Sequence, residues 1–122
     1  MLQFVAYILL LSCEFFTLCE TRTECTLAVG RLICKQDPRY HQRVTVEMLD
    51  KDTFVDAKMN ANGTDMTGNF QIFGCASDPI GPPDPYIKIQ TKCNAKKRKT
   101  IKTKVMHVFI PEVANFSDIY LD

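Results

Sequence analysis

Cysteine and histidine side chains are the groups of this 122-residue chain that could form cross-links, bind a metal ion or act as nucleophile and base. Four cysteines lie beyond the apolar N-terminal segment: Cys25, Cys34, Cys75 and Cys93. No two of these have the Cys-x-x-Cys spacing of zinc sites, and only His41 and His107 could supply further ligands. We therefore expect no metal site and no cofactor. Four cysteines in a short exported chain indicate disulfide bonds, with three possible connectivities.

The two histidines do not form a catalytic pattern. His41 falls in a predicted loop, where we expect an exposed, solvated imidazole, and His107 shares its strand face with Val105 and Phe109, as a core or edge histidine would. A catalytic nucleophile needs a histidine beside a serine or a reduced cysteine, and no serine has a histidine near it in sequence. We predict no catalytic residue and a protein that is not an enzyme.

Basic side chains are concentrated in one part of a chain whose net charge is only +1. Residues 47–84 hold seven acidic side chains and two lysines, whereas residues 85–111 hold eight basic side chains and no acidic one. The eight are Lys88, Lys92, Lys96, Lys97, Arg98, Lys99, Lys102 and Lys104. Such a cluster attracts an anionic glycan or an anionic lipid headgroup; the alternative is a solvated face that keeps a sheet soluble. Because the cluster lacks interleaved aromatic residues, we expect no nucleic-acid partner.

The first 19 residues are predicted to be a secretory signal peptide, with residues 20–122 as the mature domain. Phe4 to Leu11 form an unbroken apolar run, too short to cross about 30 Å of hydrocarbon. Thr17 and Cys19 are small residues at the −3 and −1 positions of a cleavage site. The alternatives are a buried N-terminal strand and an uncleaved anchor. We expect a secreted, extracellular protein with no transmembrane segment in its mature chain.

The mature sequence has the pattern of short strands. Apolar and polar residues alternate over 43–49, 85–93 and 100–110, and Phe70 with Ile72 and Ala28 with Leu32 mark two further strands. No long segment has helical periodicity. Several short strands in about 100 residues indicate an all-β protein, a β-sandwich of two antiparallel sheets.

Strand parity also favours one disulfide connectivity. Cys93 shares its face with Ile89, and Cys34 lies on an uncharged face, so both should point inward. Cys75 lies on the opposite face from the apolar residues of its strand, and Cys25 precedes the first strand. Two inward and two peripheral cysteines favour the pairs Cys34–Cys93 and Cys25–Cys75.

Five segments in a fixed order carry a resemblance to a known family. They are Val-Gly-Arg-Leu-Ile-Cys at 29–34, Val-Thr-Val-Glu-Met-Leu-Asp-Lys-Asp at 44–52, Thr-Asp-x-x-Gly-Asn-Phe at 64–70, Asp-Pro-Tyr-Ile-Lys-Ile at 84–89 closing on Cys93, and Ile-Pro at 110–111. The series resembles the secreted transthyretin-like family of nematodes. The resemblance implies a prealbumin-type sandwich of seven or eight strands, an extracellular destination and a Cys34–Cys93 bridge. It implies no catalytic activity.

The chain departs from this family, and from its enzymatic relatives, in three ways. Cys25 and Cys75 are additional to the usual pair, and the chain ends soon after a short last strand, which would weaken an edge-to-edge dimer, so we expect a monomer or a weak dimer. The related hydroxyisourate hydrolases use histidines, an arginine and a Tyr-Arg-Gly-Ser C-terminus, whereas this chain ends Ile-Tyr-Leu-Asp.

Two sequons predict N-glycosylation of an exported chain. Asn62 is expected in a turn, and Asn115 in a short loop. Taken together, the sequence predicts a secreted, non-enzymatic binding or adaptor protein whose partner is an unknown extracellular protein, an anionic glycan or an anionic lipid headgroup. The alternatives are a carrier of a small apolar ligand and, third, a hydrolase of the hydroxyisourate type.

Overall fold

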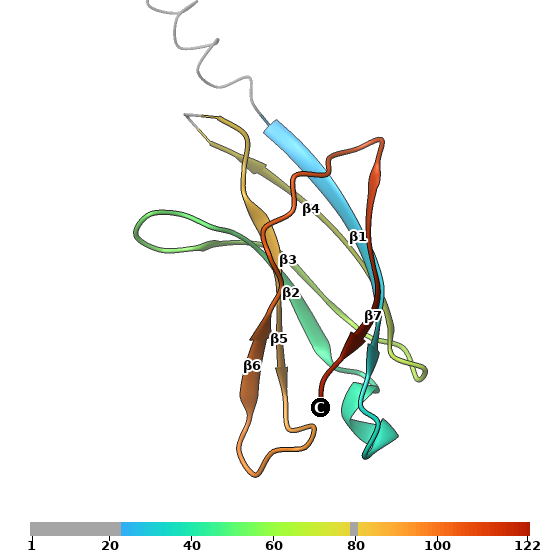
Figure 1. The fold of residues 1–122 in the computed structure, drawn as a ribbon. Helices are drawn as coiled ribbons and strands as arrows, with labels where there is room; N and C mark the ends of the chain where they lie inside the picture. The colour runs from blue at the N-terminus through green and yellow to red at the C-terminus, as the bar shows by residue number, and fades with distance from the viewer. Residues whose placement is uncertain (1–22, 79–80) are drawn as a thin grey trace, which may run out of the picture.

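The protein folds into two facing β-sheets (Figure 1). The structure is a computed structural model that describes residues 23–78 and 81–122, so the predicted signal peptide and its cleavage site lie outside the described residues. The elements are β1 (Thr23–Ile33), the short 3-10 helix η1 (Pro38–His41), β2 (Thr45–Asp50), β3 (Ala57–Gly63), β4 (Asn69–Ser77), β5 (Pro85–Thr91), β6 (Lys99–Lys102) and β7 (Val113–Tyr120). Among the described residues, no helix has the length and apolar character needed to span a membrane.

The strands are ordered β4-β1-β7 in one sheet and β3-β2-β5-β6 in the other. This confirms the predicted two-sheet sandwich, with seven strands among the described residues where the resemblance implies seven or eight. One pair differs from the expected antiparallel pattern, because β7 runs parallel to β1. The reason is the crossing segment after β6: the N–H of Ile110 donates to the carbonyl of Cys25, near the start of β1, so β7 begins at the end where β1 begins.

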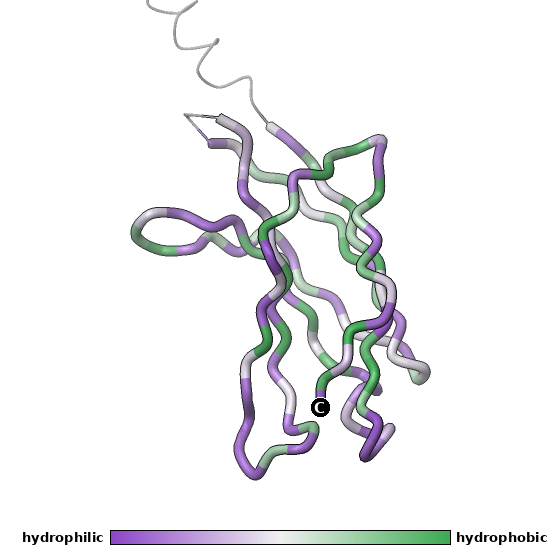
Figure 2. The backbone as a smooth tube through the Cα atoms, viewed as in Figure 1, coloured by the Kyte–Doolittle hydropathy of each residue, from purple (hydrophilic) through white to green (hydrophobic). Residues whose placement is uncertain are grey.

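The core lies between the two sheets. Val46 and Met48 of β2 and Ile87 and Ile89 of β5 are fully buried, which confirms the predicted inward faces of both strands. The alternation of apolar and polar residues along these strands is visible in Figure 2. Each such side chain contributes about 1.5–3 kcal/mol through removal of its apolar surface from water.

Three predicted details of the strands are wrong. The strand predicted over 100–110 ends at Lys102, because the hydroxyl of Thr103 accepts the N–H of Ile87 and replaces the next ladder bond. The predicted short last strand is the eight-residue β7. Asn62 lies in β3 and not in a turn, because its side-chain amide donates to the Gln71 carbonyl of β4 at 2.7 Å.

Both predicted disulfide pairings are present in the structure. The Cys34–Cys93 bridge joins the first residue after β1 to the second residue after β5, and it is buried between the sheets. Cys25–Cys75 joins directly opposed residues of β1 and β4 within one sheet. The expectation that Cys25 precedes the first strand is wrong, because the β1–β4 ladder extends as far as Thr23 and Ser77.

Candidate functional site

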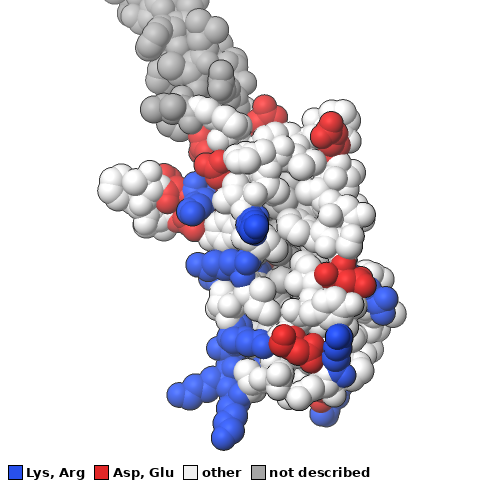
Figure 3. Space-filling model, viewed as in Figure 1, with Lys and Arg blue, Asp and Glu red and all other residues white. Residues whose placement is uncertain are grey.

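The β5–β6 hairpin gathers most of the predicted basic residues toward one end of the sandwich, where Figure 3 shows a concentration of lysine and arginine side chains. Lys102 and Lys104 instead line a hollow that also contains Lys51 and Asp56. Lys88 and Lys102 are directly opposed in the β5–β6 ladder. Lys92 and Lys104 lie beyond the ends of their strands, so neither belongs to the β5–β6 ladder. The remaining four are in the turn between the strands or at the start of β6: Lys96, Lys97, Arg98 and Lys99.

A groove of about 570 Å³ separates this hairpin from the segment that leads into β2. Lys92 and Arg98 line it from the hairpin, and Arg39 and Arg43 line it from the other side. The two arginines were not among the predicted site residues. Only the pairing of β2 with β5 brings them near the hairpin. The sequence signal was a basic residue at the start of the strand predicted over 43–49 and another four residues before it.

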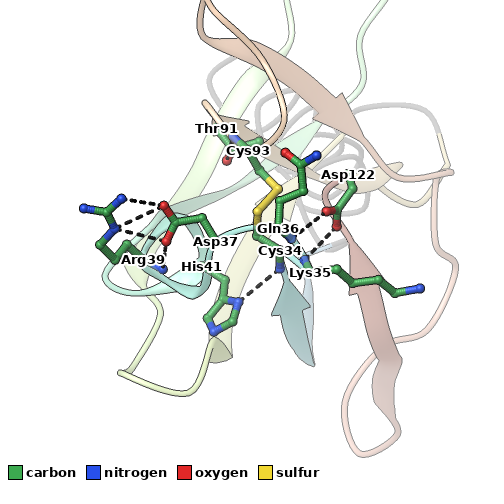
Figure 4. Close-up of a disulfide and its surroundings, with 9 residues drawn as sticks. All are labelled: Cys34, Lys35, Gln36, Asp37, Arg39, His41, Thr91, Cys93 and Asp122. Carbon is green, nitrogen blue, oxygen red and sulfur yellow. Dashed lines mark hydrogen bonds and ion pairs between the residues drawn. A yellow bond between two sulfur atoms is a disulfide. The ribbon is translucent and has the colours of Figure 1, made fainter.

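The four cations of the groove are not equivalent. Arg39 is held by Asp37, with Nε donating to Oδ1 at 3.0 Å and Nη2 to Oδ2 at 2.6 Å (Figure 4). The hydrogen bond from Arg39 lowers the pKa of the Asp37 carboxyl, and the same bond raises the pKa of the Arg39 guanidinium. In the described part of the chain, no carboxylate lies within salt-bridge distance of Arg43, Lys92 or Arg98. Glu47 is the acidic residue of the lining.

Arg43 is held in an uncommon backbone conformation. Its φ is 53°, in the left-handed region that costs a non-glycine residue about 1–3 kcal/mol. Thr64 fixes the chain on both sides, because its hydroxyl accepts the N–H of Val44 at 2.8 Å and donates to the carbonyl of His41 at 2.8 Å. The backbone at Arg43 is therefore locked by its neighbours.

The inner disulfide and the C-terminus stiffen the same end of the molecule (Figure 4). Nδ1 of His41 accepts the N–H of Cys34 at 3.0 Å, so the expected solvated imidazole is instead a half-buried acceptor. The Asp122 carboxylate accepts the N–H groups of Lys35 and Gln36 at 2.9 and 3.1 Å. The hydrogen bond from Lys35 is the main cause that lowers the pKa of Asp122. The Asp122 carboxylate also lies near the two disulfide sulfurs, but sulfurs bonded to each other are not thiolate ligands for a metal.

The loop between β2 and β3 forms a second surface, and it projects away from the sandwich in Figure 1. The Tyr86 hydroxyl donates to the Asp56 carboxylate, which places the loop base over β5 and buries Tyr86. Burial, followed by the bond to Asp56, raises the pKa of Tyr86 to about 12, and the bond from Tyr86 lowers the pKa of Asp56. At the loop tip, Phe54 is 94% exposed and Val55 78% exposed.

Acidic residues gather at the opposite end of β2. The Asp50 side chain is buried, accepts the N–H of Asp84 at 2.7 Å and lies close to Asp78. Burial is the main cause that raises the pKa of Asp50 to about 6. His107 is exposed beside Asp84, with Nε2 3.6 Å from Oδ1, so its predicted place in a core or sheet edge is wrong. The charge segregation of the sequence thus becomes a basic end and an acidic end.

The two sequon asparagines have different surroundings. The Asn62 amide donates across to the other sheet, as described above. Asn115 is exposed within β7 and not in a loop, and its Oδ1 accepts the N–H of Ser117 at 2.9 Å. Ser117 has a φ of 56° and lies where the β1–β7 register shifts, so the sequon occupies a bulge that turns Asn115 to solvent.

Comparison with protein-family models gives a match to the transthyretin-like family over residues 29–111. The chain belongs to the transthyretin-like family. This family assignment agrees with the sandwich and with the sequence motifs quoted above.

Two further comparisons add little to the family assignment. No curated protein matches the chain. A 9R-lipoxygenase from Cyanothece PCC8801 aligns with 80% of this chain at 16% identity and a TM-score of 0.49. The chain spans 16% of the length of that enzyme.

Proposed function

We propose that this member of the transthyretin-like family is a secreted, non-enzymatic binding protein that engages an anionic ligand at cell surfaces through its basic end. The proposal includes the nematode origin and the adaptor role predicted from the sequence, with an extracellular protein as a further partner. The alternatives, a carrier of a small apolar ligand and a hydroxyisourate-type hydrolase, gain no support from a particular feature of the described residues.

The observation that carries the proposal is the placement of Lys88 directly opposite Lys102. Like charges in opposed positions of a β-ladder destabilise the sheet. The other six basic residues of the cluster lie in the adjoining turn, at the start of β6 or just beyond the strand ends, which adds to the repulsion. An anionic ligand would relieve this repulsion, so a surface that costs stability in the free protein is suited to binding.

Export is supported by the disulfides. Two bridges in a domain of about 100 residues are typical of proteins that fold in an oxidising compartment, because thiols stay reduced in the cytosol. Both bridges close long loops, of 50 and 59 residues, and so restrict the unfolded chain. The exposed Asn115 is the sequon that we propose to carry a glycan in the exported protein.

The proposal is tested by retention of the mature, oxidised protein on immobilised heparin and on vesicles containing phosphatidylserine at low salt. Charge reversal by Lys102→Glu with Lys104→Glu should abolish retention. The matched control is Lys35→Glu with Lys58→Glu, which changes the net charge equally at exposed positions outside the hairpin, and it should retain most of the binding. Failure of the unmutated protein to bind either matrix would end the proposal.

A further inference from the structure

We infer that the groove between η1 and the β5–β6 hairpin is a binding site for a linear sulfated glycan. The inference rests on the proposed function and names the ligand of its basic end. The groove is lined by cations from two separate parts of the chain, and two of its three arginines, Arg39 and Arg43, lie outside the cluster that the sequence indicated.

The cations of the groove suit sulfate groups. Arg43, Lys92 and Arg98 are exposed and line one concave surface. A guanidinium group offers a planar set of donors that binds two oxygens of an oxyanion at once, and a lysine adds a mobile point charge. Arg39 is already paired with Asp37, so we assign the sulfate contacts to the other three.

The remaining lining has the chemistry of a sugar site. Tyr40 is 39% exposed and offers an aromatic surface against which the apolar face of a pyranose ring can pack. Thr45 and Gln90 are exposed polar side chains of the same groove, able to donate to and accept from ring hydroxyls. A simple counterion site would need the cations alone.

The cations continue beyond the groove, as a polymer requires. Lys96 and Lys97 lie in the hairpin turn, and Lys99 and Lys102 mark the two ends of β6. At about 3.3 Å per residue, β6 adds a run of about 10 Å to the groove. Repeated charges over this distance match the repeated sulfates of a linear glycan better than a single lipid headgroup.

The position of the exposed apolar residues argues against a bilayer as the ligand of the groove. Thr45 borders the groove at the start of β2, whereas Phe54 and Val55 follow the far end of that strand. The length of β2 alone separates them by about 17 Å at about 3.3 Å per residue. A membrane surface seated on the groove would leave these two side chains unused.

The conformation of Arg43 provides a clean variant for the test. Because its φ is 53°, glycine adopts this backbone without strain, so Arg43→Gly removes the guanidinium without endangering the fold. The test variant combines Arg43→Gly with Arg98→Gln. The matched control, Lys35→Gln with Lys58→Gln, removes the same charge at exposed positions outside both the groove lining and the run of cations that continues it.

The experiment measures the dissociation constants of the mature, oxidised protein for a heparin-derived octasaccharide, for unsulfated hyaluronan fragments and for phosphatidylserine vesicles, at about 150 mM NaCl, where long-range attraction is screened. Of the three probes, we expect only the octasaccharide to bind strongly. The groove variant should weaken it about tenfold or more, as loss of two charge-assisted contacts implies. The control variant should weaken it less than about threefold, since its two lysines make no contact with a ligand in the groove and long-range attraction is screened at this salt.

Each other result overturns a different claim. Tight binding of the vesicles without binding of the octasaccharide would refute the glycan and leave the proposed function intact. Equal losses in the groove and control variants would refute the groove as the site, because the attraction would then be general. If the protein bound none of the three probes, at this or at lower salt, the proposed function itself would be refuted.

Discussion

Asp50 makes the stability of this fold depend on pH, and Asp50→Asn isolates the effect. The Asp50 carboxyl is buried, and its pKa is raised from 3.8 to about 6, mainly by burial and further by Asp78, while the hydrogen bond from the Asp84 N–H acts to lower it. Between pH 3.8 and about 6, the Asp50 carboxyl therefore stays protonated in the folded protein and is ionised in the unfolded chain. The asparagine variant keeps an oxygen that can accept the Asp84 N–H, and it carries no charge.

The magnitude follows from the shift in pKa. A rise from 3.8 to about 6 is roughly two units, and each unit corresponds to about 1.4 kcal/mol, so ionised Asp50 costs the folded state about 3 kcal/mol. Because the pKa of the folded state is the higher one, stability from this group is complete below pH 3.8 and is lost as the pH rises through about 6. The pKa values of Asp37, Asp65 and Asp122 are lowered in the folded protein, so these groups have the opposite effect on stability. Their contribution is present above the usual pKa of an aspartate and is lost as the pH falls below it.

The assay is urea denaturation of the oxidised protein between pH 4 and 8, with Asp118→Asn as an exposed control that removes the same charge. We expect Asp50→Asn to be more stable than the unmutated protein by up to about 3 kcal/mol at pH 8 and to differ little at pH 4. The control should follow the unmutated protein throughout. The reasoning from burial would be refuted if Asp50→Asn were less stable than the unmutated protein at pH 8. It would also be refuted if these two proteins had the same dependence of stability on pH.

Two further predictions concern the disulfides and one turn. Replacing Cys34 and Cys93 by alanine should lower the free energy of unfolding by about 4 kcal/mol plus the cost of the cavity left in the core. Replacing Cys25 and Cys75 should lower it by less, because that bridge is peripheral. Calorimetry of the two double variants gives the order, and equal losses of stability would contradict the prediction. Gly68→Ala should cost at least about 2 kcal/mol, because Gly68 has a φ of 86° and an added Cβ would lie 2.2 Å from a backbone oxygen of β1; an unchanged urea midpoint would show that the turn can rearrange.

Strands whose two faces differ in polarity were predictable from the sequence. The alternation around Val46 and around Ile89 is a local property, and the structure confirms both strands and the inward face of each. The inward parity of Cys34 and Cys93 followed from the same pattern, and so did their pairing. Local periodicity therefore gave the layers of the sandwich and the bridge between them.

Features that depend on distant partners were not predictable. The sequence of β3 has little strand propensity, and the strand is held in part by the amides of Asn60 and Asn62, which donate to the carbonyls of Phe73 and Gln71 in the facing sheet. The burial of Tyr86 requires the loop that carries Asp56, thirty residues earlier in the chain.

The candidate site was predicted in the same partial way. The run of basic residues over 85–111 can be read along the chain, and the structure adds that Lys88 lies opposite Lys102. The groove cannot be read along the chain in this way. Arg39 and Arg43 precede β2, and they come close to Lys92 only because β2 pairs with β5. The left-handed conformation of Arg43 likewise depends on hydrogen bonds with a distant threonine.

The central claim is that the basic end of this protein binds an anionic extracellular ligand, and a titration followed by the backbone amide signals in NMR tests it most directly. Adding a sulfated oligosaccharide to the mature, isotopically labelled protein should shift the signals of residues 39–47 and 88–102, and added salt should reverse the shifts. Signals of the acidic end, including Asp50 and the tip residues Phe54 and Val55, should stay in place. Shifts confined to that end, or none at low salt for sulfated glycan and anionic lipid alike, would contradict the account.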